Sequence, residues 1–156
     1  MAKQLDDKNL EKINPQNSEQ LKFISKLHIK LLPNSAPSKL GALFMTKFYL
    51  SILSQMNLIN GYTYKINGKY VGFALFTKYP NNFIIKGIKN RPFYFCLILI
   101  KMVLNKPKVL YTILELIRGT DSNYNMESYD KIGQFLSFGV LDKYLQYEDE
   151  NQNRIP

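Results

Sequence analysis

The dipeptide Asn67-Gly68 constrains the fold more than any other feature of the sequence, because it separates two strand-like segments. Tyr62–Ile66 and Lys69–Thr77 are rich in β-branched and aromatic residues, as strands usually are. Asn-Gly tolerates the positive φ angles that both central residues of a type I′ turn require. The sequence therefore predicts an antiparallel β-hairpin over residues 62–77.

The segments before the hairpin alternate between extended and helical patterns. Leucine and isoleucine recur there at three- and four-residue spacing, and Asn or Ser stands where a helix would begin. We expect a strand at Asn9–Asn14, a helix from the Asn17-Ser18 cap to Pro33, and a second helix from the Asn34-Ser35 cap to about Met56.

The segments after the hairpin complete a predicted α/β (α+β) fold, with a small, mainly antiparallel sheet, packed helices and an inserted helical pair. The last strand, KIGQFLSFGVL, is largely apolar, so we expect it to be buried on both faces. The expected segments are a basic irregular connection at 78–91, helices at 92–104 and 107–118, a polar loop at 120–130 and a strand at 131–141.

Length and composition exclude several classes of protein. A chain of 156 residues with 46% hydrophobic residues can bury a core, which excludes wholesale disorder. The single cysteine excludes an internal disulfide and a multi-cysteine zinc site, and the single histidine excludes sites that need two imidazoles, so no metal is expected. We expect one domain at 1–144 and an acidic polar tail at 145–156.

Targeting signals are lacking in the sequence. The start, MAKQLDDKNLEK, has no apolar stretch of the kind that a signal peptide carries. The most apolar segment, residues 93–104, falls short of the roughly 20 residues that a membrane-spanning helix needs. We therefore expect a soluble, cytoplasmic protein.

The charge is concentrated in the middle of the chain. Residues 20–114 carry fourteen Lys or Arg and no Asp or Glu, whereas the whole chain has a net charge of +9. Such a segment suggests an anionic partner: nucleic acid, a membrane surface or a phosphorylated small molecule. Compositional drift toward lysine explains the same numbers, and the two explanations stay open.

Few side chains in the sequence are candidates for a catalytic role. His28 lies on or beside an apolar helix stripe, where a packed, hydrogen-bonded histidine is more usual than a base. Cys96 lies among Phe and Leu, which predicts an inert thiol in the core. Glu127 and Asp130 precede the last strand; either is a possible base, although a solvated loop position is the more usual explanation.

Two non-enzymatic interpretations also follow from the residues. Eleven Tyr and ten Phe interleaved with Lys would suit stacking on single-stranded nucleic acid, although most rings lie at core-facing positions. The helical pair at 91–118 could lie on an anionic membrane with Lys101, Lys106 and Lys108 at the headgroups, or pack on the domain as a helical hairpin.

Three groups of residues, in this order, resemble the GNAT family of N-acetyltransferases over about residues 8–144. The stretch HIKLLPNS followed by KLG, Phe44 and Tyr49 is similar to the H-x-x-x-L-P-x-S … L-G-x-x-F … Y pattern of one bacterial branch. YKINGKYVGFALF looks like the family's hairpin. LSFGVLDKY, at 136–144, looks like the strand that leads into the acetyl-CoA site.

The resemblance implies acetyl transfer from acetyl-CoA to the amine of a small-molecule or protein acceptor. It places backbone groups of Phe138, Gly139 and Val140 at the pantetheine arm and the loop residues Pro33, Asn34 and Ser35 beside the acceptor. Attack of the amine on the thioester needs a base and donors for the developing oxyanion. The candidate bases are Glu127, acting through water, and His28.

The sequence departs from the family after the last strand. No glycine follows Gly139, and Glu148-Asp149-Glu150 stands where a glycine-rich loop would bind the pyrophosphate. We therefore expect a truncated or degenerate member of the family. Its last strand would have an uncovered edge, which favours self-association.

Overall fold

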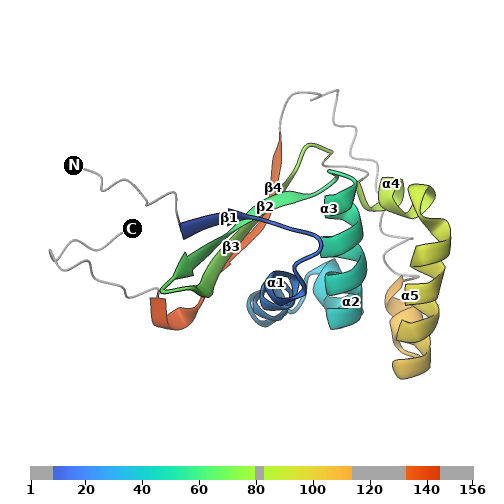
Figure 1. Cartoon of the computed structure of the whole chain (residues 1–156). Helices are drawn as coiled ribbons and strands as arrows, with labels where there is room; N and C mark the ends of the chain where they lie inside the picture. Colours follow the sequence, from blue (N-terminus) through green and yellow to red (C-terminus); the bar gives the residue numbers. More distant parts are fainter. Residues whose placement is uncertain (1–8, 80–82, 114–132, 145–156) are drawn as a thin grey trace, which may run out of the picture.

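The computed structural model describes residues 9–79, 83–113 and 133–144, and these form a mixed α/β structure. Its sheet has four antiparallel strands in the order β1-β2-β3-β4. The strands are β1 (Leu10–Lys12), β2 (Asn60–Ile66), β3 (Lys69–Thr77) and β4 (Gln134–Val140). The small antiparallel sheet that the sequence predicts is confirmed, and Figure 1 shows the helices gathered to one side of it.

The central hairpin forms as predicted. Ile66 pairs with Lys69, which leaves a two-residue turn, and φ is 51° at Asn67 and 75° at Gly68. Positive φ at both positions is what a type I′ turn requires. Because side chains alternate along a strand, Thr63 and Leu75 point into the core while Tyr62 and Phe76 stack on the opposite face.

Helix α1 (Ser18–Leu31) begins at the predicted cap. The side chain of Asn17 accepts a hydrogen bond from the backbone N–H of Gln20 at 3.1 Å. The predicted apolar stripe faces the sheet, and Leu21, Ile24 and Leu27 are buried there. A stripe of this kind positions α1 across β3 and β4, which it contacts.

The second predicted helix is three segments rather than one: α2 (Ala36–Phe44), the π-helical η2 (Met45–Ile52) and the short α3 (Leu53–Gln55). Gly41 interrupts the first of them with φ at +87°, a conformation that residues with a Cβ rarely adopt. The predicted apolar face survives this interruption, because Leu40, Phe44 and Phe48 are all buried.

The prediction of an irregular connection at 78–91 is wrong where the structure describes it. Helix α4 spans Phe83–Asn90, and Phe83 and Gly87 are buried on the same side, four residues apart. A Cβ at Gly87 would come within 2.2 Å of Leu53, so this helix approaches α3 closely. The helix is only about two turns long, which is too short for a helical period to stand out in the sequence.

Helix α5 (Pro92–Asn105) corrects the prediction for Cys96. The helix exists as expected, but Cys96 is exposed, because Ile98 and Met102 form the buried side of α5 instead. A further helical segment begins at residues 109–113. The remainder of the expected second helix, the loop at 120–130 and the tail at 145–156 lie outside the described residues.

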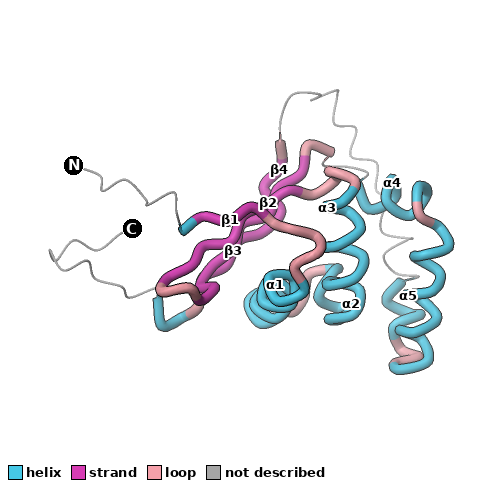
Figure 2. Tube along the Cα trace, viewed as in Figure 1, coloured by secondary structure: helices cyan, strands magenta, loops and turns pink. Residues whose placement is uncertain are grey.

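The last strand is not buried on both faces, contrary to prediction. In β4, Ser137 and Gly139 face the core, whereas Phe138 is 69% exposed and Phe135 lies on the surface beside it. No described helix covers the second face of the sheet. Figure 2 shows the strands as one layer and the helices as another.

Within the described residues, no helix is long and apolar enough to cross a membrane. Helix α1 packs on the sheet, α2 and η2 pack against α1, and α4 and α5 lie beyond these segments. This order leaves α5 farthest from the sheet in Figure 1.

Candidate functional site

Most of the site residues that the sequence predicts lie around the C-terminal end of α1. Gly139 of β4 pairs with Phe73 of β3, beneath that end. A Cβ at Gly139 would lie 2.5 Å from Leu31 Cδ1 and 2.9 Å from Phe73 Cε1. The loop with Pro33, Asn34 and Ser35 follows α1 directly, so the candidate cofactor strand and the candidate acceptor loop are neighbours.

Strand β4 is an edge of the described sheet. It pairs with β3 on one side, and no strand among the described residues pairs with it on the other. Alternate backbone N–H and C=O groups of an edge strand point away from its partner. The Leu141 N–H donates to Val71 O of β3, so by this alternation Gly139 also bonds toward β3, and the backbone groups that point away from β3 are those of Phe138 and Val140.

A chain of hydrogen bonds links the acceptor loop to His28. Ser35 caps α2, and its hydroxyl donates to Ser38 Oγ at 2.8 Å. Ser38 Oγ lies 3.0 Å from His28 Nδ1. Ser38 Oγ can donate to an unprotonated Nδ1 or accept from a protonated one, so the imidazole tautomer sets the direction of this bond.

His28 is only 2% exposed and packs between the rings of Phe73 and Tyr49. Burial lowers the pKa of His28, because the charged imidazolium loses its hydration, so the ring is neutral at pH 7. The same burial raises the pKa of Tyr49. The interpretation of His28 as a packed, hydrogen-bonded residue is confirmed, and a role as base stays a prediction.

One ion pair joins the two ends of the candidate site across its surface. Lys30 near the end of α1 pairs with Asp142, which opens the short helix η3 (Asp142–Tyr144) after β4. Both side chains are exposed, so water screens the pair strongly. The pair of side chains carries no net charge.

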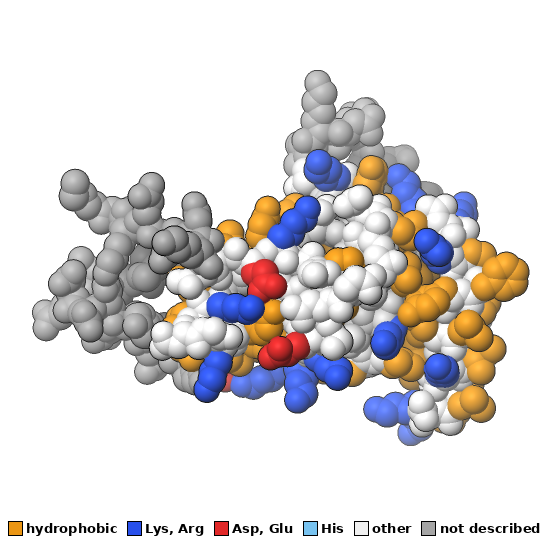
Figure 3. All heavy atoms as spheres, in the orientation of Figure 1, with side chains coloured by type: hydrophobic (Ala, Val, Ile, Leu, Met, Phe, Trp, Pro, Cys, Tyr) orange, Lys and Arg blue, Asp and Glu red, His pale blue; other side chains and the backbone are white. Residues whose placement is uncertain are grey.

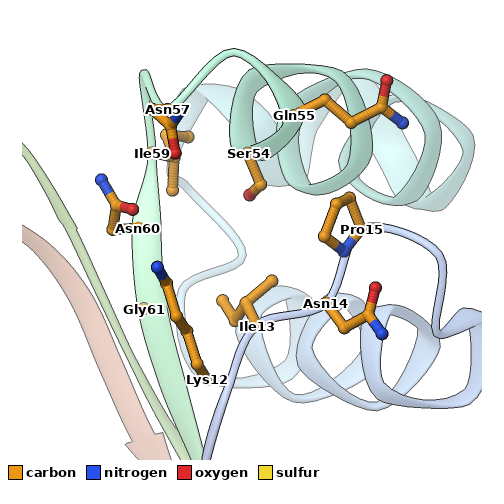
Figure 4. Close-up of a pocket in the computed structure, with 10 residues that line it drawn as sticks. All are labelled: Lys12, Ile13, Asn14, Pro15, Ser54, Gln55, Asn57, Ile59, Asn60 and Gly61. Carbon is orange, nitrogen blue, oxygen red and sulfur yellow. The ribbon is translucent and has the colours of Figure 1, made fainter.

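A cavity of about 520 Å³ lies at the opposite edge of the sheet, away from β4 (Figure 4). The end of β1, the start of β2 and the end of α3 surround it, and Lys12 is its only charged side chain. The remaining lining residues are apolar or amide-bearing, with one hydroxyl, that of Ser54: Ile13, Asn14, Pro15, Ser54, Gln55, Asn57, Ile59, Asn60 and Gly61. No local sequence pattern indicated this cavity.

The role of the Ser38 side chain, which links the loop to His28, is what sequence reasoning missed. Its signal was available, because Ser35 and Ser38 are three residues apart at a helix start, and a serine at that spacing can bond back to the cap. Glu127 lies outside the described residues. Within the described residues, no group of three His, Cys, Asp or Glu is placed to hold a metal ion.

Comparison with protein-family models, with curated proteins and with solved structures gives no match to this chain. A function for this chain can therefore be inferred only from its sequence pattern and from the geometry at the end of α1.

Proposed function

We propose that this chain is a GNAT-like N-acetyltransferase that works on acetyl-CoA in the cytoplasm. The observation that carries the proposal is the meeting of β4, the end of α1 and the 33–35 loop. Gly139 lies against Leu31 at that point, and the loop begins two residues after Leu31. These are the segments that the resemblance assigns to the acetyl donor and the acceptor.

The donor groups present suit the pantetheine arm better than the phosphates. An edge strand offers backbone N–H and C=O groups to an amide chain, as β-strand addition does for peptides. The neighbouring Asp142 is an acid that pairs with Lys30. We therefore expect acetyl-CoA to bind weakly and mainly through its pantetheine arm.

The reaction is direct transfer. The acceptor amine attacks the thioester carbonyl, a C–N bond forms, the C–S bond breaks, and CoA leaves as its thiol after taking a proton. Neutral His28 reaches the acceptor loop only through Ser38 and Ser35, so it orients that loop. Glu127, acting through water, is the base that we propose for the amine proton.

An NMR titration of the isotopically labelled chain tests the donor site. We expect acetyl-CoA to shift the amide signals of Phe138, Gly139 and Val140 and to leave those of β1, the other edge strand, unchanged. S-acetylpantetheine should bind within about tenfold of acetyl-CoA, because the phosphates contribute little. No shift in β4 at millimolar acetyl-CoA would overturn the proposal.

Single-stranded nucleic acid is a second candidate, because the face of the sheet opposite the helices carries aromatic rings. Tyr62 and Phe76 stack there with centroids 6.2 Å apart, and Phe135 and Phe138 meet edge to face. Bases stack on such rings with little sequence preference. Oligo(dT) can be added in the same titration. Shifts in the amide signals of Tyr62 and Phe138, with an affinity that falls as the salt concentration rises, would favour this candidate over acetyl transfer.

A further inference from the structure

Helix α5 is apolar on two opposite sides. Ile98 and Met102 are buried against the domain, while Phe93 is 86% exposed and Leu104 is 79% exposed. A helix that is apolar all round is normally buried all round. Its outward side therefore indicates a surface that is covered when the protein works.

The exposed side chains form one continuous stripe. Phe93, Leu97, Ile100 and Leu104 are spaced by four, three and four residues, so they share one side of the helix. At 1.5 Å per residue the helix is about 21 Å long. Leu110 and Tyr111, after the turn that follows α5, are exposed as well.

Among the described residues, the charged residues next to the stripe in the sequence are all cations. Lys101 lies on α5 itself, and the chain just beyond it carries Lys106 and Lys108, all three exposed. Arg91 precedes the helix, and there is no acidic residue anywhere between residues 20 and 114. Figure 3 shows the same combination, with apolar side chains along the α5 side of the molecule and Lys or Arg beside them.

An apolar stripe flanked by cations favours one kind of binding partner over the others. A second copy of the chain, docked through the same stripe, would bring its own cations against Lys101, Lys106 and Lys108, which repel them. An anionic bilayer accepts both features, because it has an apolar interior and negative headgroups. We propose that α5 lies in the interface of an anionic membrane, with the stripe facing the acyl chains and the lysines at the headgroups.

This attachment is peripheral. Helix α5 is too short and carries Lys101, so it lies along the surface rather than crossing it, in agreement with the absence of a spanning helix among the described residues. The proposal is independent of acetyl transfer, since the stripe is on α5 and the candidate site is on α1 and β4. An enzyme held in this way would act on acceptors at a membrane surface.

A single introduced tryptophan tests the proposal, because the natural chain contains none. The Phe93→Trp variant is mixed with vesicles of phosphatidylcholine containing about one-third phosphatidylserine. We expect a blue-shifted emission and quenching by brominated lipid. A Lys26→Trp variant, with the probe on the exposed side of α1, should show neither change.

Two sets of substitutions separate the apolar and electrostatic contributions in a vesicle sedimentation assay. Leu97→Ser with Leu104→Ser should weaken partitioning at least tenfold. Lys101→Gln, Lys106→Gln and Lys108→Gln together should weaken it about 100-fold, or about fivefold per cation. The matched control, Lys22→Gln, Lys26→Gln and Lys69→Gln, removes the same charge elsewhere and should change partitioning far less.

All of these positions are exposed, so unchanged melting temperatures will confirm that the variants fold. Equal binding to vesicles of phosphatidylcholine alone would overturn the proposal. So would a dimer in sedimentation velocity that Leu97→Ser with Leu104→Ser dissociates, because the stripe would then be an interface between copies. Loss of acetyl-CoA binding would leave this result unaffected, so the two proposals fail separately.

Discussion

Helices α1 and α5 have the same length of 14 residues but opposite relations to solvent. On α1 the exposed side is polar, with Lys22 and Lys26, and the apolar side is buried against the sheet. On α5 the exposed side carries large apolar residues such as Leu97. The fold of the described residues therefore accounts for the apolar stripe of α1, whereas on α5 it fully buries only Ile98 and Met102.

The comparison separates residues that the fold needs from residues that another surface needs. Burying an apolar side chain is worth roughly 1.5–3 kcal/mol, and α1 gains this within the domain. The stripe on α5 gains much less from folding, since more than half of each of its side chains stays exposed, so its sequence is better explained by contact with something else. Substitutions on the two helices should accordingly differ in what they damage.

The largest expected difference is in the free energy of unfolding. Ile24 on α1 is fully buried, so Ile24→Ala should lower that free energy by about 2–5 kcal/mol through lost burial and a residual cavity. Leu97→Ala on α5 should change it by less than about 0.5 kcal/mol, since Leu97 is 59% exposed. Urea unfolding followed by circular dichroism measures both. Equal losses would mean that Leu97 is part of the core and that α1 and α5 do not differ in their exposure to solvent.

A smaller effect is expected where α1 meets β4. Gly139→Ala places a Cβ against Leu31 and the ring of Phe73, so it should destabilise the fold by about 1–3 kcal/mol. Gly133→Ala, just before β4, is the matched control, because its Cβ would meet only Thr77 O at an ordinary 3.5 Å. Thermal unfolding of the two variants measures the difference. If Gly139→Ala were as stable as the control, α1 would not be held tightly on the candidate cofactor strand.

Much of the fold could be predicted from local sequence. The features that could not be predicted depend on tertiary contacts. The Asn67-Gly68 turn and the Asn17 cap are set by neighbouring residues, so they were predictable. The side of α5 that faces the domain was not, because an all-apolar helix has no period to read; Cys96 was therefore assigned to the core.

The candidate site shows the same division. The loop and strand segments were predictable from their motif-like patterns, and His28 was correctly interpreted as packed. Its partner Ser38 comes from a different helix, so the hydrogen bond depends on how α1 and α2 pack. The cavity beside Lys12 depends likewise on three separate elements meeting, and no local pattern encodes that.

The smallest expected effect is a pH dependence of the free energy of unfolding, and it tests the burial of α1 directly. Burial lowers the pKa of His28 in the folded state below its unfolded value of about 6.5, so the unfolded chain binds a proton more readily. Stability from the neutral ring is therefore fully present above about pH 6.5 and is lost as the pH falls below that value toward the folded pKa. The loss is at most about 1.4 kcal/mol per pH unit for this one group.

Urea midpoints at pH 7.5 and 5.5 measure the effect, and His28→Gln is the comparison variant. Glutamine does not titrate, so the variant should be less stable at pH 7.5 but should lose less stability than the natural chain on acidification. Carboxylates that titrate over the same range are identical in both chains and cancel in the difference. An equal loss in both would mean that His28 is hydrated in solution, and α1 would then be exposed to water on the side that the structure buries.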